Sequence, residues 1–370
     1  MWCAVFGSGE LATRMLSALA VAATSVVLVK LGEAMFWRRA GIIAGVVYPL
    51  VPATAWAAGE ARSFALAALA SAVTLLALVR AVDRPTAWWR WVLVALAIAF
   101  TGWLFVFTIL MVPAALLLIP REEWRRHWPR ILACVGAGCL AVLPLVVVAA
   151  GQWGQVAWIP DRSTIEMLDS LISAPYFREQ GRFAAVVWSL LGGGVVLLWV
   201  RRPRYRRPVA ALACCLALPT VALALTGPAL GQSLYFSRYL VFTAPALALL
   251  LAAVLAALPR PWMAGLAIVL FAGGAVAPMQ ARTDPLSKSS WIFMVETLSA
   301  RAEPGDAMVA FSNHTTMARV VYPEPLATLP LLNEIVDPAR RPTRLATTIG
   351  EPSRVLCRSY TGCGSRLRAA

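Results

Sequence analysis

The sequence predicts an all-α polytopic membrane protein with about ten membrane segments. Of its 370 residues, 60% are hydrophobic, and the mean hydropathy is +0.73, whereas soluble domains are nearer half apolar. Only 14% of the residues are charged, and they gather between apolar runs. Several of these runs reach the roughly 20 residues that a helix needs to cross a bilayer. A bundle of membrane helices explains all three observations.

The predicted spans follow one another with few residues between them. They cover residues 11–30, 40–58, 63–79, 91–119, 131–150, 183–200, 208–225, 239–258 and 262–277. The run 91–119 is too long for one untilted crossing and short for two. We expect two short crossings with a break near Thr101 and Gly102, and a re-entrant hairpin would preserve the same parity.

The basic loops support this division of the run 91–119. Arginines recur at 121–130 and at 201–207, and two crossings place both clusters on the face that carries Arg38 and Arg39. Because cytoplasmic loops are enriched in Lys and Arg, we expect a multi-pass inner (plasma) membrane protein with cytoplasmic basic loops. The net charge of +15 is explained by these loops. We therefore expect no nucleic-acid partner, because no basic and aromatic platform is present.

The composition changes after residue 280. We expect residues 1–280 to form the transmembrane helical domain and residues 281–370 an external, partly ordered tail. Within the tail, hydrophobic spacing predicts a helix at 291–302, and residues 307–311 are typical of a short strand, so a small α/β unit is expected. Cys357 and Cys363 flank a polar segment, and whether they form a disulfide is left open.

Three ordered segments resemble a known family. Residues 59–66, Gly-Glu-Ala-Arg-Ser-Phe-Ala-Leu, resemble the Gln-Glu-Ala-Arg-x-Tyr-Ala-Leu signature of family 39-like bacterial glycosyltransferases, which are protein-mannosyltransferase-like and have the GT-C fold. Residues 6–20 resemble the family's Phe-Gly-x-x-Glu-Leu-Ala-x-Arg segment, and residues 236–249 its Arg-Tyr-Leu…Pro-Ala-Leu element. Gly59 and Phe64 depart from the pattern. Together the matches extend from about residue 6 to residue 311.

The resemblance implies a membrane glycosyltransferase. Its donor would be a sugar linked to a polyprenyl phosphate, its acceptor would bind at the external face, and a carboxylate would deprotonate the acceptor hydroxyl in an inverting displacement. In the family that base is an aspartate of an external loop before the Phe-Gly segment, and nothing before Phe6 matches it. We therefore expect the chain to lack the family's first span and catalytic loop. The catalytic residue is unassigned, and a divalent metal follows from the resemblance alone.

Charged residues at the external ends of the spans are the candidate site. Glu60 and Arg62 lie at the junction of two spans, where charges are costly unless they are paired, hydrated or in use. They form either a structural ion pair or part of a donor site in which Arg62 holds the anion. Arg238, followed by Tyr239, suits a lipid phosphate because arginine binds phosphate in a fork geometry; an interfacial anchor is the alternative.

Two further residues complete the candidate set. Arg14 matches a family arginine, but it could equally extend its charge to the membrane surface. Asp161 lies in the polar segment 151–182, whose tryptophans and charges suit either sugar stacking or an interfacial amphipathic helix. The sequence also leaves open a transporter or flippase of a lipid-linked sugar, which would require a midplane cavity with broken helices, and an inactive assembly subunit.

Overall fold

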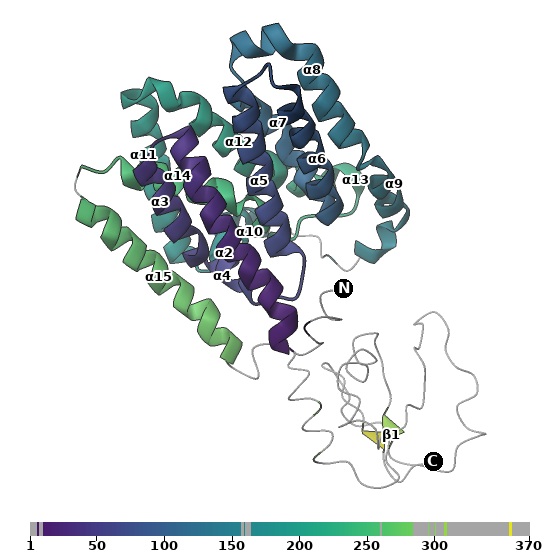
Figure 1. The fold of residues 1–370 in the computed structure, drawn as a ribbon. Coiled ribbons are helices and arrows are strands. Elements are labelled where there is room, and N and C mark those ends of the chain that lie inside the picture. Colours follow the sequence, from purple (N-terminus) through teal and green to yellow (C-terminus); the bar gives the residue numbers. More distant parts are fainter. Residues whose placement is uncertain are drawn as a thin grey trace. The chain divides into compact units, whose positions relative to one another are not determined.

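The computed structural model describes residues 10–156, 164–259 and 261–283, the single residues 6, 159, 295 and 300, and the pairs 307–308 and 355–356. The chain divides into two compact units, Met1–Gln280 and Ala281–Ala370 (Figure 1). In the second unit, β1 (Ala307–Met308) pairs in parallel with β2 (Val355–Leu356). Within the predicted helix at 291–302, the described residues are Val295 and Ala300, and the rest of that prediction lies outside the described residues. Cys357 and Cys363 also lie outside them.

Close glycine packing joins the first two helices of the bundle. The helix α2 (Glu10–Met35) is followed by α3 (Arg38–Val47), and the two lie side by side (Figure 1). A Cβ atom built on Gly41 would lie 2.2 Å from the backbone oxygen of Val29. Only a residue without a side chain allows this approach, so Gly41 sets the distance between α2 and α3.

A sharp bend follows α3. The short 3₁₀ helix η1 (Tyr48–Leu50) leads into α4 (Pro52–Ala58), and the two parts of this apolar stretch are bent by 66°. Pro52 has no N–H to continue the hydrogen-bond ladder, and the buried Thr54 hydroxyl donates to the carbonyl oxygens of Tyr48 and Val51. The bend brings the chain to the turn before α5 (Phe64–Asp83).

The apolar run 91–119 is divided, as the loop charges predicted. It forms α6 (Trp88–Leu104), then η2 (Val106–Met111), α7 (Val112–Ala115) and η3 (Leu116–Leu118). The break lies at Phe105, whose backbone is extended with φ −161°. The Thr101 hydroxyl hydrogen-bonds that of Thr74 in α5 at 2.9 Å, so the end of α6 is fixed to its neighbour just before the break.

The second half of the bundle surrounds a central helix. Its elements are α8 (Arg121–Leu140), α9 (Leu143–Gly151), η4 (Trp153–Val156), α10 (Thr164–Phe177), α11 (Gly181–Arg201), η5 (Pro203–Tyr205), α12 (Arg206–Ala224), α13 (Thr226–Leu230), η6 (Ser237–Thr243), α14 (Ala244–Ala256) and α15 (Pro261–Thr283). Every residue of α14 is buried, and α14 packs against α3, α5, α11 and α12. Its apolar residues on all sides suit this position in the interior of the bundle.

These elements confirm the predicted all-α polytopic fold. Among the described residues, six helices are long and apolar enough to cross a membrane, the bent pair counts as a seventh, and shorter apolar helices cover Trp88–Leu104, Val106–Leu118 and Trp262–Val276. An apolar helical stretch therefore stands at each predicted span in the described part of the chain. How many of them cross fully stays a prediction.

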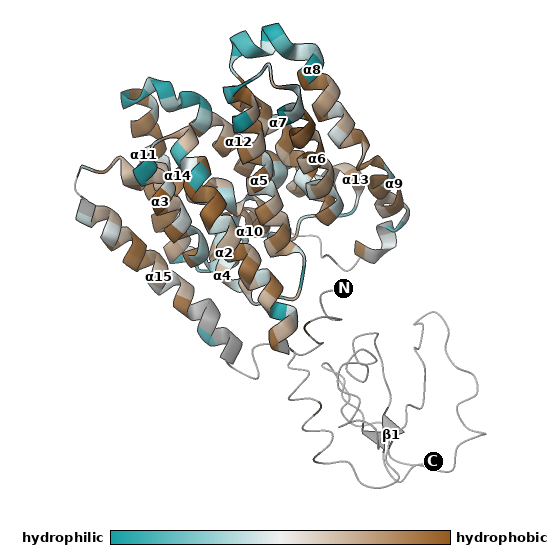
Figure 2. Ribbon diagram, viewed as in Figure 1, coloured by the Kyte–Doolittle hydropathy of each residue, from teal (hydrophilic) through white to brown (hydrophobic). Residues whose placement is uncertain are grey.

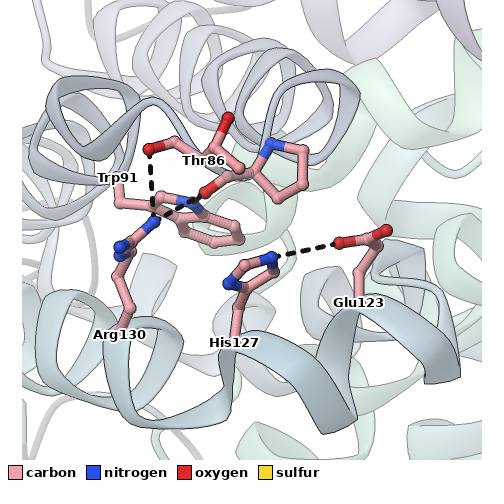
Figure 3. Close-up of polar contacts among 6 residues, drawn as sticks. Thr86, Trp91, Glu123, His127 and Arg130 are labelled. Atoms are coloured by element: carbon pink, nitrogen blue, oxygen red, sulfur yellow. Dashed lines mark hydrogen bonds and ion pairs between the residues drawn. The ribbon is translucent and has the colours of Figure 1, made fainter.

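Basic turns lie together at one end of the bundle, where Figure 2 shows the hydrophilic ends of α8 and α11. Arg130 in α8 donates to the carbonyl oxygens of Pro85 (2.9 Å) and Thr86 (3.3 Å), and Trp91 donates to Pro85 at 3.0 Å (Figure 3). Nearby on α8, His127 lies 3.6 Å from Glu123. The Arg130 bonds fasten the middle of α8 to the turn between α5 and α6.

A second pair of basic turns meets through aromatic rings. The Tyr205 ring lies 5.7 Å from that of Phe36 and 5.1 Å from that of Trp37, so the α11–α12 turn contacts the α2–α3 turn. The basic loops therefore lie at the same end of the bundle, which agrees with their common enrichment in arginine. Its cytoplasmic orientation stays a prediction.

Cysteine labelling on intact cells tests the orientation. In a cysteine-free background, a membrane-impermeant maleimide should label Glu166→Cys on α10 directly and Arg204→Cys only after the cells are permeabilised, because the basic loops are expected inside. Labelling at 204 without labelling at 166 would contradict the orientation.

Gly41→Ala should destabilise the bundle by about 1–3 kcal/mol, because its new methyl group would meet the Val29 carbonyl oxygen. The control is Gly136→Ala in α8, where an added Cβ meets no atom within 4 Å and where the gain in helix propensity should stabilise by up to about 1 kcal/mol. Thermal unfolding of both variants in detergent measures the difference. Equal stability of the two would refute the role given to Gly41.

Candidate functional site

The turn between α4 and α5 carries Glu60 and Arg62 at the end of the bundle away from the basic turns. Ser17 of α2 donates its hydroxyl to the carbonyl oxygen of Glu60 at 2.6 Å and lies 3.5 Å from that of Arg62. This contact fixes the turn against the start of α2. Arg14 is half-buried one helical turn before Ser17, so the predicted residue Arg14 lies on the same part of α2 as this anchor.

Arg238 reaches the same region from η6. It is half-buried, and its guanidinium lies 4.2 Å from the centre of the Phe236 ring. Its charge interacts with those of Arg62, Glu60 and Arg178. The structure thus brings together Glu60, Arg62 and Arg238, which are almost 180 residues apart in the chain. Their part in binding stays a prediction.

Arg178 belongs to this group, and sequence reasoning missed it. It stands between α10 and α11, with its guanidinium 4.8 Å from the centre of the Trp56 ring of α4. Partial burial of this guanidinium lowers the pKa of Arg178 from its ordinary value, while the negative charges of Glu179 and Glu60 act in the opposite direction. Such a group remains protonated at neutral pH.

The backbone at Arg178 explains why it was missed. Arg178 has φ 54° and Glu179 has φ 69°, the left-handed conformation that non-glycine residues rarely adopt. Each such residue costs about 1–2 kcal/mol, so the surrounding fold holds this turn. No sequence motif marks Arg178. The sequence signal that could have found it is a charged residue shortly before the predicted span 183–200.

Aromatic rings line one side of the group. The Tyr239 ring lies 5.6 Å from that of Phe236, 5.7 Å from those of Phe105 and Phe107, and 6.4 Å from that of Phe64. The predicted residue Tyr239 is therefore part of an aromatic wall. Rings of this kind favour nearby cations on their faces and reduce the water around a bound ligand.

Glu60 and Arg62 lie in a non-helical turn, and the Ser17 hydroxyl faces both of their backbone carbonyl oxygens. The ion pair given as the alternative for their side chains stays a prediction. We call Arg62, Arg178 and Arg238, which surround Glu60, the arginine cluster.

The arginine cluster is suited to binding an anion. Three guanidinium groups act on one region that contains Glu60. Guanidinium groups bind phosphate and carboxylate through paired N–H donors. No group of three or more metal-ligating side chains occurs in the described ranges.

The polar segment 151–182 contains an amphipathic helix. On α10, Ile165, Leu168 and Ile172 are 81%, 54% and 49% exposed, and they recur at helical spacing. The opposite side of α10 packs against η6, α11 and α4. An exposed apolar stripe favours the interfacial-helix interpretation of this segment. Asp161, the candidate site residue in this segment, lies outside the described residues.

The sequence matches one family model. Residues 1–150 match the dolichyl-phosphate-mannose-protein mannosyltransferase family. A search of curated proteins found no match.

The fold resembles solved structures of ArnT from Cupriavidus metallidurans. The structure bound to undecaprenyl phosphate aligns with a TM-score of 0.57 and 15% identity, over 89% of this chain and 77% of ArnT. The apo structure aligns with a TM-score of 0.57 and 14% identity over the same shares. The alignment shows that the chain has the GT-C fold of ArnT, and the family match shows that its first 150 residues are similar to protein mannosyltransferases.

Proposed function

We propose that the chain is a membrane glycosyltransferase that takes a sugar from a polyprenyl-phosphate donor and transfers it to an acceptor at the external face. The observation that carries the proposal is the arginine cluster, which places three cations next to an aromatic wall at one end of a GT-C bundle. ArnT, whose fold this chain shares, was solved with undecaprenyl phosphate.

The arginine cluster would act on the phosphate of the donor. When the bond between the sugar and the phosphate breaks, negative charge grows on the departing phosphate oxygen. Arginines held in place before the reaction stabilise this charge without reorganising. Arg238 is half-buried, and a guanidinium with little water around it interacts with the phosphate more strongly than an exposed one.

Glu60 and the aromatic wall would position the sugar. A carboxylate accepts hydrogen bonds from sugar hydroxyls, and Glu60 stands among the arginines that would hold the phosphate. Tyr239 and its aromatic neighbours would cover the apolar face of the ring and exclude water. The base that deprotonates the acceptor hydroxyl is unassigned, and Asp161 remains the first residue to test for it.

A flippase for the same lipid is the second candidate. The observation that favours it is the 66° bend between α3 and α4, since broken helices line the substrate sites of many transporters. A flippase would move the lipid-linked sugar across the membrane and leave the glycosidic bond intact. The two functions therefore differ in the covalent product.

Arg238→Ala should weaken binding of a polyprenyl phosphate about 10- to 100-fold, because one charge-assisted interaction with the phosphate is lost. Arg238→Lys should recover part of the affinity, since lysine keeps the charge but lacks the fork. Equilibrium binding of radiolabelled undecaprenyl phosphate to the purified chain measures both.

Arg178→Ala should weaken the same binding to a similar extent. Its matched control is Arg204→Ala, because the Arg204 guanidinium also lies 4.8 Å from an aromatic ring, that of Tyr205, in a basic turn at the other end of the bundle. Equal losses for the two alanine variants would mean that overall charge, and not the arginine cluster, drives binding.

Membranes that contain the chain should transfer radiolabelled sugar from a polyprenyl-phosphate sugar to an acceptor, and Arg238→Ala should reduce this transfer. The assay also follows the labelled lipid across sealed vesicles. Movement of intact lipid without a glycosylated product would support the flippase and contradict the transferase.

A further inference from the structure

A groove opens between α11 and α12 on the outer surface of the bundle. It has a cavity volume of about 340 Å³, within the range of small-molecule sites. Its lining includes Trp188, Gly192 and Val195 of α11, Leu216 and Ala217 of α12, and Tyr176 of α10. We call it the α11–α12 groove.

The walls of the groove are apolar. The few polar groups that reach it are satisfied within the protein: the Tyr176 hydroxyl hydrogen-bonds that of Thr243 at 2.6 Å, and Thr220 donates to Leu216 at 2.6 Å. Water binds stably only where several polar partners face it. A groove of this kind in a membrane helix bundle is therefore suited to a hydrocarbon chain.

The groove has a buried floor and an open rim. Leu191, Leu216 and Leu250 on the floor are 4%, 8% and 2% exposed, whereas Val221 on the rim is 51% exposed. Gly192 leaves the α11 side open, because a Cβ built there meets no atom within 4 Å. The rim thus lies on the surface that apolar membrane helices turn towards lipid, and a chain can enter from the side.

One end of the groove adjoins the arginine cluster. Tyr176 lines the groove and stands two residues before Arg178, which is part of the cluster. Thr243, the hydrogen-bond partner of Tyr176, lies on η6 together with Arg238. Two segments therefore connect this end of the groove to the anion site, and the tail of an amphiphile whose anionic head binds at the cluster would begin at this end.

We propose that the α11–α12 groove holds the first part of the polyprenyl chain of the donor. This inference rests on the proposed function and adds a subsite for the tail. Lipid tails are as apolar as the groove, so binding there depends on close packing of the chain against its walls. Filling the groove with protein side chain should therefore weaken long-chain donors selectively.

Gly192→Leu tests the proposal, because the new side chain fills the groove without meeting the backbone. Its matched control is Gly193→Leu, which makes the same change on the next residue; Gly193 also has no atom within 4 Å of an added Cβ and does not line the groove. Ala217→Leu narrows the groove from the α12 side. All three are made in the full chain and compared by thermal unfolding in detergent.

The ligands are undecaprenyl phosphate and geranyl phosphate, whose chain is too short to fill the groove. Gly192→Leu and Ala217→Leu should each bind undecaprenyl phosphate about tenfold more weakly. Both should bind geranyl phosphate as the parent does, and Gly193→Leu should match the parent for both ligands.

Four results would overturn the assignment. Unchanged undecaprenyl phosphate binding by Gly192→Leu and Ala217→Leu would reject the groove while leaving the proposed function intact. Equal losses for both ligands would mean that the variants disturb the head site. Loss of copurified phospholipid with unchanged undecaprenyl phosphate binding would assign the groove to ordinary bilayer lipid. A parent chain that binds neither ligand would reject the proposed function, and the tail subsite with it.

Discussion

The interior of a bilayer offers no water to satisfy polar groups, and this constraint organises the whole bundle. Charged side chains are confined to the ends of the helices, so the basic turns gather at one end and the arginine cluster at the other. Polar groups within the spans bond to nearby carbonyl oxygens, as Thr54 does at the bend. At the centre of the bundle, α14 is apolar and buried along its whole length.

The arginine cluster is costly for the protein by itself. Three like charges repel each other, and Arg178 and Glu179 hold a rare backbone conformation. Two aromatic faces offset part of this cost, those of Trp56 under Arg178 and Phe236 under Arg238. Strain and clustered like charges persist where the surrounding structure imposes them, and such places are commonly functional sites. An anion bound at the cluster would relieve the repulsion.

Short connections unite the parts of the site. The bend at Pro52 directs α4 so that its last residues present Trp56 to Arg178, and Ser17 holds the following turn. From there, α10 leads back to Tyr176 and the α11–α12 groove. The head of an amphiphile and the start of its tail would thus contact segments that lie far apart in the chain.

Hydropathy and loop charge were sufficient to predict the helical bundle, the positions of its apolar segments and the division of 91–119, because these depend on composition over many residues. The family-like segments also identified Glu60, Arg62, Arg238 and Tyr239. The tertiary structure alone decided which turns hold these residues and that Arg178 joins them. Those outcomes depend on the angles of single turns and on packing between distant helices, and neither leaves a periodic pattern in the sequence.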